Sequence, residues 1–323
     1  MTVLWNSVQS VLVVVLIMIL GYVLRRKGWF DDQFGGTISK FIKNIALPAS
    51  IFVSVLSRLT RGQLVSFSGY LVYGFISVII GYLIAFFLVR VMKVRPGRRG
   101  IFINAMVNAN TIFIGLPLNI ALFGDQSMTY FLVYYIVNTV STWAFGVFLI
   151  SNDDPTKPKQ TGNHHIDWKK VLPMPLVGFL VALVFLLLNI PILKISFVNS
   201  TLTYVGNLVT PLSLVYIGIV LADAGLKSIH FDRDTIVALL GWFVLAPVVM
   251  VGLILLGAHF GNDMPTLASQ TLIVQSATPM LAVLPILANE AHGDVEYATN
   301  VVTTSTVLFI VVVPILMSLI QFV

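Results

Sequence analysis

Long apolar stretches, separated by short polar segments, run along the whole chain. Taking apolar stretches of about 17 to 25 residues as membrane spans, the pattern predicts ten helices, with limits near residues 5–24, 38–57, 65–91, 100–122, 128–150, 171–190, 199–221, 235–259, 267–288 and 296–320. The one long polar interruption, residues 151–170, contains the Pro, Asn, Asp and Lys residues typical of a surface linker. The pattern therefore predicts two groups of five spans, residues 1–150 and 171–323.

Basic residues fall mainly in alternate loops. Sixteen of the 19 Lys and Arg residues lie on one side of the ten predicted spans, and Arg58, Arg61 and Lys194 lie on the other. Since basic loops stay in the cytoplasm, we expect both termini outside the cell. An odd number of spans per half turns the second half upside down. The predicted fold class is therefore an all-α polytopic membrane protein built as a five-plus-five inverted repeat.

Two of the predicted spans, the fourth and the ninth, are interrupted by polar residues and prolines. Residues 108–118 read NANTIFIGLPL and residues 276–286 read SATPMLAVLPI, and an ungapped alignment matches Pro117 with Pro285. Gly115 and Pro117 both weaken the helical hydrogen-bond ladder. Interrupted helices at corresponding places in two halves point to the substrate site of a transporter. The sequence therefore predicts an internal polar site where the two spans meet.

The second and seventh spans share an Asn-x-x-x-Pro pattern, Asn44 to Pro48 and Asn207 to Pro211. Two matching pairs in the same order support a duplication. An Asn one turn before a Pro can bond the carbonyl that the proline leaves free, so these residues fit either substrate contact or helix packing alone.

The interrupted spans offer neutral groups that can hold an anion. A half-helix that starts inside the membrane presents N–H groups with partial positive charge, and amide and hydroxyl side chains lie beside each break. No acidic or basic residue lies near the middle of a predicted span, so we expect a site without a buried cation. The predicted substrate-binding residues are Asn108, Asn110, Thr111, Gly115, Pro117, Gln275, Ser276, Thr278, Pro279, Pro285, Asn44, Pro48, Asn207 and Pro211. The alternative is that the prolines only kink helices and the polar residues only join them; for Asn138 in span five, packing is the favoured interpretation.

The sequence lacks the residues that several classes of function require. The chain has no cysteine, and the tandem His164 and His165 have no spaced ligand set, so no metal site or cofactor is expected. No nucleophile with a base and no phosphate-binding loop occurs, which argues against an enzyme or an ATP-driven pump. The basic residues are spread over loops, so we expect no nucleic-acid partner. Without a titrating carboxylate in mid-membrane, any coupled proton would travel on the substrate, entering as the monoanion of a dicarboxylic acid.

The Asn-rich GLP segment, the Asn-x-x-x-Pro of span two, the short central linker and the proline-broken span nine together resemble the auxin efflux carrier family. The similarity extends over essentially the whole chain and is closest to bacterial malate and malonate permeases. It implies that spans four and nine cross at their prolines, here Thr111 to Pro117 and Thr278 to Pro285. It also implies a scaffold of spans one, two, six and seven, often in a homodimer, with the remaining spans forming a moving, elevator-type transport domain.

The sequence thus predicts a secondary active transporter of small organic acid anions, with malate as the expected substrate, in the plasma membrane of a bacterium. Its partners would be a dicarboxylate, protons in a symport, the lipid bilayer and a second copy of the chain. The alternatives are a carrier or exporter of another carboxylate, such as malonate or lactate, and a membrane receptor that binds without transport.

Overall fold

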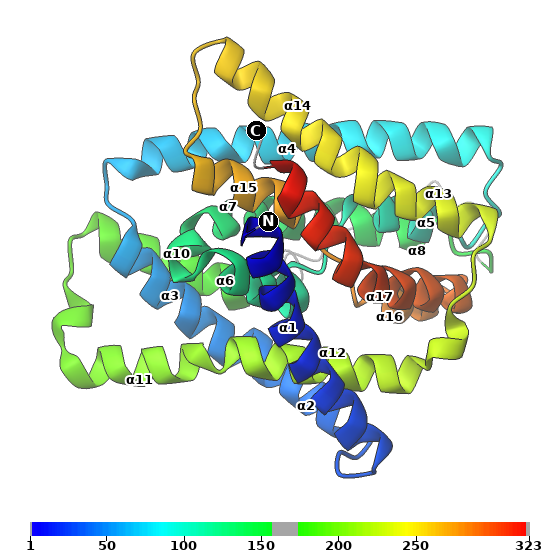
Figure 1. Ribbon diagram of the computed structural model, residues 1–323, viewed down its shortest axis with the longest axis horizontal. Helices are drawn as coiled ribbons and strands as arrows, with labels where there is room; N and C mark the ends of the chain where they lie inside the picture. The colour runs from blue at the N-terminus through cyan, green and yellow to red at the C-terminus, as the bar shows by residue number, and fades with distance from the viewer. Residues whose placement is uncertain (1, 157–173, 321–323) are drawn as a thin grey trace.

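The computed structural model describes residues 2–156 and 174–320 as helices joined by short loops (Figure 1). Seven helices in these ranges are long and apolar enough to cross a membrane: Val8–Arg26, Phe34–Arg58, Ser68–Val91, Asp125–Asn152, Ser196–Ala224, Arg233–His259 and Val295–Leu319. The predicted all-α polytopic membrane fold is confirmed. Of the remaining predicted spans, the sixth is described from Met174, and the fourth and ninth are each divided into two half-helices. Most of the predicted linker, including His164 and His165, lies outside the described residues.

The first half contains α1 (Thr2–Arg26), α2 (Phe34–Phe41), η1 (Ile42–Ala46), α3 (Leu47–Arg58), α4 (Gln63–Val91), α5 (Arg99–Val107), η2 (Thr111–Gly115), α6 (Leu116–Phe123), η3 (Asp125–Ser127), α7 (Met128–Val140), η4 (Ser141–Gly146) and α8 (Val147–Asn152). The second half contains α10 (Met174–Leu187), η5 (Ile192–Lys194), α11 (Ser196–Asn207), α12 (Val209–Ala224), η6 (Leu226–Ser228), α13 (Arg233–Leu240), η7 (Gly241–Leu245), α14 (Ala246–His259), α15 (Thr266–Gln275), α16 (Leu284–Glu290) and α17 (Val295–Leu319).

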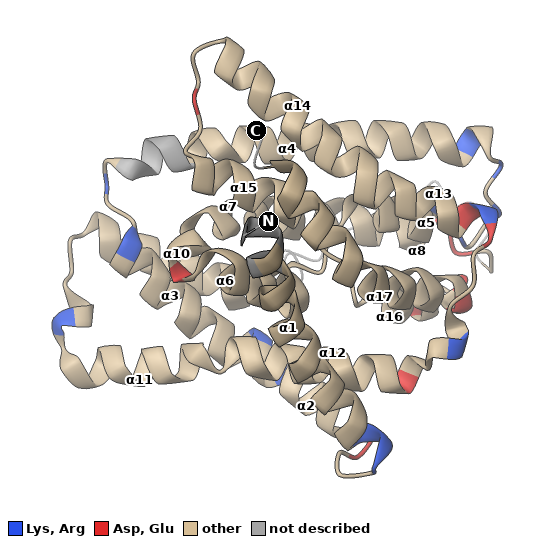
Figure 2. Cartoon of the chain, in the orientation of Figure 1, with Lys and Arg blue, Asp and Glu red and all other residues tan. Residues whose placement is uncertain are grey.

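Charged residues are confined largely to helix ends and loops, while the central parts of the helices are nearly free of them (Figure 2). The outward-facing side chains of α4 include Ile79, Leu83 and Phe87, which are among its most exposed residues. A bilayer surrounds a span with hydrocarbon, which explains why apolar side chains cover the outside of this helix. Because lipid cannot hydrogen-bond a backbone, the helix also satisfies its N–H and C=O groups internally.

Three prolines in the spans follow π-helical turns. η1 precedes Pro48, η2 precedes Pro117 and η7 precedes Pro247, and each proline lies in the first turn of the α-helix that follows. A proline cannot donate to the carbonyl one turn earlier, and its ring needs room there. The wider π turn supplies that room without ending the helix. These prolines therefore adjust the helix locally, and the chain continues across them.

The two halves pack on each other reciprocally. α1 lies along α12, and α10 lies along α3, so the first span of each half contacts the second span of the other. Both contacts rely on glycine: a Cβ on Gly218 of α12 would lie 2.0 Å from the carbonyl oxygen of Met18, and one on Gly178 of α10 would lie 2.9 Å from the Cα of Pro48. The two halves therefore make equivalent contacts with each other.

An ion cluster joins the two halves at one end of the bundle. The Arg98 guanidinium lies 2.7 Å from Asp232 and from Asp294, 3.1 Å from Asp234, and 4.3 Å from the centre of the Tyr297 ring. Although burial acts to raise it, the pKa of Asp294 is lowered by hydrogen bonds from Arg95, the Tyr297 amide and Arg98. The contribution of Asp294 to stability is therefore present at neutral pH and is lost as the pH falls through this lowered pKa.

We expect Gly218→Ala to destabilise the fold by about 1–3 kcal/mol, because the added methyl group forces α1 and α12 apart. The measurement is the thermal midpoint of the purified protein in detergent. Gly252→Ala in α14 is the matched control, since a Cβ there meets nothing within 4 Å, and its midpoint should be unchanged or slightly higher. Equal midpoints for the two variants would contradict the close α1–α12 contact.

Candidate functional site

The two interrupted spans cross each other through short extended segments. α5 ends at Val107, and the chain is non-helical over residues 108–110 before η2 begins. α15 ends at Gln275, and α16 begins only at Leu284. The segments pair antiparallel at Ala109 and Met280. The Asn110 backbone amide donates to the Pro279 backbone carbonyl over 2.8 Å, and the Leu281 backbone amide donates to the Asn108 backbone carbonyl over 3.3 Å.

Spans four and nine cross as predicted, but the predicted position of the crossing in span four was wrong. The sequence placed it at Thr111 to Pro117, whereas the unwound residues are Asn108, Ala109 and Asn110, and the helix has restarted by Thr111. The reason is that Pro117 occupies the first turn of α6 after a π turn, where its missing N–H is tolerated. In span nine the non-helical stretch begins near Ser276 and ends just before α16, whose first turn contains Pro285.

Side chains from neighbouring helices complete the hydrogen bonding of the crossing. Asn138 of α7 accepts from the Ala109 amide over 2.8 Å and donates to the Ala109 carbonyl over 3.0 Å. The Met280 amide donates to the Ser305 hydroxyl over 3.1 Å, and the Trp242 indole donates to the Thr278 carbonyl. Every unpaired backbone group in an apolar interior costs several kcal/mol. Asn138 is therefore a structural residue of the crossing.

Asn108 is buried in a polar network behind the crossing. Its side chain accepts from the Ser141 hydroxyl over 2.6 Å and donates to the Asn104 side chain over 2.7 Å. Asn104 in turn donates to the carbonyls of Gly100 and Gly146, each over 2.9 Å. These contacts join η4 to α5, and a Cβ on Gly146 would lie 2.2 Å from the Asn104 side chain.

A cavity of about 390 Å³ lies against the crossing. Its walls come from the α2–η1 segment, the crossing segments, α7 with η4, and the start of α10. The lining residues are Lys40, Lys43, Asn44, Ala109, Asn110, Thr111, Ile112, Phe113, Tyr135, Asn138, Thr139, Thr142, Trp143, Met174, Pro175, Leu281, Ala282 and Val283. Its volume is in the range of small-molecule sites.

Three of the predicted site residues, Asn44, Asn110 and Thr111, line this cavity, and the others lie outside its lining. Gln275 donates to the Gly115 carbonyl over 2.9 Å, which packs the two spans together. The hydroxyls of Ser276 and Thr278 donate to carbonyls three residues earlier in their own chain. The Pro279 carbonyl pairs with Asn110, Pro48 packs on Gly178, and Pro117 and Pro285 begin half-helices. Asn207 and Pro211, at the junction of α11 and α12, are exposed.

Three buried polar atoms in the cavity wall have no hydrogen-bond partner: Asn110 Nδ2, the Tyr135 hydroxyl and Thr142 Oγ1. The Asn110 side-chain oxygen accepts from the Phe113 backbone amide at the start of η2 over 3.3 Å. Of the two polar atoms in the Asn110 side chain, only Nδ2 is therefore without a partner. A buried donor without a partner costs about 1–3 kcal/mol. All three groups can donate, so the cavity is suited to a ligand with acceptor oxygens.

Lys43 also lines the cavity, whereas the sequence analysis expected a site without a buried cation. It lies in η1 and is half-buried, whereas Lys40, one turn earlier, is exposed. Lys40, Lys43 and Asn44 share one helical face, since residues three and four apart are neighbours on a helix. That spacing could have identified Lys43 from the sequence, because both lysines fall inside the predicted span 38–57. Tyr135 and Thr142 carry no comparable signal.

The described residues were also compared with the ligand sets that metal ions need. No group of three or more His, Asp or Glu side chains there could hold an ion.

Comparison with known proteins gives a match over nearly the whole chain. Residues 6–317 match the family model described as membrane transport protein, which is the auxin efflux carrier family that the motifs resemble. An uncharacterized transporter of Methanothermobacter thermautotrophicus is 24% identical over 314 residues, covering 96% of this chain and 97% of the relative. An uncharacterized transporter of Methanocaldococcus jannaschii is 21% identical over 304 residues, covering 94% and 95%.

We expect Asn138→Leu to lower the thermal midpoint strongly, because it leaves both backbone groups of Ala109 buried and unpaired, at about 1–3 kcal/mol each. Asn119→Leu is the matched control. Asn119 is also fully buried, but its amide donates only to the Ser127 hydroxyl, over 2.6 Å, so a smaller loss is expected. A midpoint for Asn138→Leu equal to that of the control would contradict the structural role of Asn138.

Proposed function

Since the chain belongs to the membrane transport protein family, we propose that this transporter is a secondary carrier of small organic acid anions, with malate as its substrate. The observation that carries the proposal is the cavity at the crossing, where three buried donors without partners belong to the crossing and to α7 with η4, and Lys43 belongs to the α2–η1 wall. A carboxylate offers several acceptor sites and one negative charge. It would therefore satisfy these donors and the lysine together.

The start of η2 adds to the attraction for an anion. The half-helix that begins at Thr111 presents its first amide groups beside Asn110, and the helix dipole places partial positive charge there. Because Asn110 both caps this half-helix and lines the cavity, the ligand and the helix end share one residue. Small displacements of the crossing would then alter binding.

Alternating access would follow from the position of the cavity. One wall, the α2–η1 segment with the start of α10, belongs to the proposed scaffold of spans one, two, six and seven, and the crossing belongs to the proposed transport domain. Movement of one group against the other would change the side from which the cavity opens, without ATP. The scaffold faces would also form the proposed homodimer, and both termini would lie outside the cell.

A single half-buried lysine favours a ligand with one full negative charge. A dicarboxylic acid such as malate meets this condition as its monoanion, which would carry a proton with it. Malonate and lactate meet the same condition and remain alternatives, as do export and, less favoured, ligand binding without transport.

We expect purified protein in proteoliposomes to take up labelled malate with saturation. Asn110→Ala and Thr142→Val should each lower uptake about tenfold to hundredfold, since a hydrogen bond to a charged group is worth about 1.5–3 kcal/mol. Ser213→Ala is the matched control, because this buried hydroxyl of α12 also lacks a partner but lies outside the cavity. It should transport normally.

Two results would overturn the proposal. Malate binding without flux would indicate a receptor. Normal transport in a well-folded Asn110→Ala variant would show that the cavity at the crossing is not the substrate site.

We expect Lys43→Met to raise the KM for malate by about tenfold or more, because it removes the cavity's half-buried charge while keeping a long side chain. Lys43→Arg should retain most of the activity, and Lys40→Met, at an exposed position, should have a smaller effect.

At constant total malate, wild-type uptake should fall as external pH rises and the monoanion is depleted. Uptake that follows the dianion concentration would contradict the monoanion hypothesis.

A further inference from the structure

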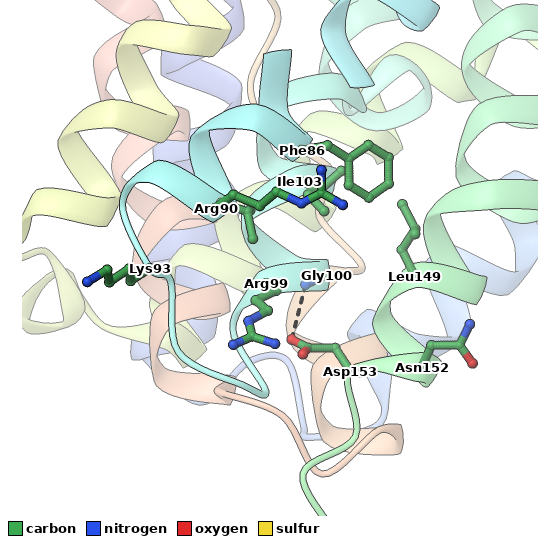
Figure 3. A pocket seen from close by; sticks show the side chains of 10 residues that line it. Phe86, Arg90, Lys93, Arg99, Gly100, Ile103, Leu149, Asn152 and Asp153 are labelled. Carbon is green, nitrogen blue, oxygen red and sulfur yellow. Dashed lines mark hydrogen bonds between the residues drawn. The ribbon is translucent and has the colours of Figure 1, made fainter. Parts of the chain in front are cut away.

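A second cavity, of about 480 Å³, lies where α4, α5 and α8 approach one end of the bundle (Figure 3). It shares no lining residue with the cavity at the crossing. Its lining residues are Phe86, Val89, Arg90, Lys93, Arg99, Gly100, Ile103, Leu149, Asn152 and Asp153. The set combines three cations with an apolar wall.

The charge of this cavity is positive and largely uncompensated. Within the described ranges, Arg90, Lys93 and Arg99 form no ion pair. Arg99 Nε donates to the Val94 carbonyl over 2.8 Å, which fixes the side chain and leaves its other guanidinium nitrogens available. The one carboxylate, Asp153, accepts from the Gly100 amide at the start of α5 over 3.2 Å.

The positions of the labelled side chains distinguish the three cations. Arg90 lies above the cavity next to Phe86 and Ile103, and Arg99 lies below it near Asp153, whereas Lys93 extends away from the others (Figure 3). Two guanidinium groups in the lining of one cavity are suited to an anion with several oxygens, such as a phosphate, because each can donate two parallel hydrogen bonds.

The apolar wall continues toward the membrane. Phe86 of α4 is 41% exposed and Phe145 of η4 is 58% exposed, and the Tyr82 ring lies 6.3 Å from each of their rings. These aromatic rings belong to two membrane spans that both end at the cavity, one at Val91 and the other at Asn152. The cations therefore lie at the membrane boundary, and the rings lie on its apolar side.

We propose that this cavity binds the headgroup of an anionic phospholipid, whose acyl chains lie against Phe86 and Phe145. Arg90 and Arg99 bind the phosphate, and Lys93 adds long-range attraction. Basic pockets between spans on the cytoplasmic side are suited to anionic headgroups, because that leaflet carries the negative surface charge. The basic loops of this chain fall on the same predicted side. A zwitterionic lipid would present a cation to the same arginines and bind less well.

The test is native mass spectrometry of the full-length protein released from nanodiscs that contain equal amounts of phosphatidylglycerol and phosphatidylcholine. The wild type should retain phosphatidylglycerol preferentially. Arg90→Gln with Arg99→Gln should weaken this retention about thirtyfold, since each basic residue near an anionic surface contributes about fivefold. Arg90→Lys with Arg99→Lys should preserve part of it and thereby separate loss of charge from loss of fold.

The matched control is Arg26→Gln with Lys27→Gln, which removes two exposed charges at the end of α1, outside the cavity, and should leave retention unchanged. Equal retention of the two lipids, or loss in this control as large as in the cavity variant, would overturn the proposal. Competition by glycerol 3-phosphate at concentrations similar to those of the lipid would identify a site for a soluble phosphate and would overturn the lipid assignment.

Discussion

The backbone at the crossing of the two interrupted spans is the constraint on which the rest of the structure depends. Breaking two helices in an apolar interior exposes amide and carbonyl groups that lipid cannot satisfy. The chain solves this by pairing Asn110 with Pro279 and Leu281 with Asn108. Asn138, Trp242 and Ser305 supply further partners from other helices. The positions of α7, η7 and α17 are therefore tied to those of the two breaks.

This requirement also determines which polar groups remain for a ligand. Asn108 and Gln275 are engaged in joining helices, and Asn138 is occupied by Ala109. Asn110 differs, because it lines the cavity and caps η2 with its oxygen, and its side-chain nitrogen has no partner. The polar residues near the breaks thus divide into those that hold the crossing together and those that line the cavity with an atom left unpaired. Only the second kind is suited to bind a substrate.

The sequence was sufficient to predict the helical fold and the pair of interrupted spans, because both follow from span length, composition and the matching prolines. It was not sufficient to separate the two kinds of polar residue. Asn108 and Asn110 are two positions apart and look alike in the sequence, but the Asn108 side chain bonds Asn104 and Ser141, whereas Asn110 caps η2 and lines the cavity. Tyr135 and Thr142 could not have been identified, because their importance comes from the approach of α7 and η4 to the crossing. Pro117 was misleading because it lies about two turns after the true break, where the π turn η2 accommodates it.

The two halves contribute unequally to the cavity in spite of their similar order of elements. The first half supplies Asn110, Thr111 and the α7–η4 polar groups, whereas the crossing segment of the second half supplies Leu281, Ala282 and Val283. A ligand in this space would meet hydrogen-bond donors on one side and an apolar surface on the other. That difference suits a molecule with a charged end and a hydrocarbon part, such as a short organic acid. An asymmetric molecule would therefore bind in one orientation, with its charged end toward the donors of the first half.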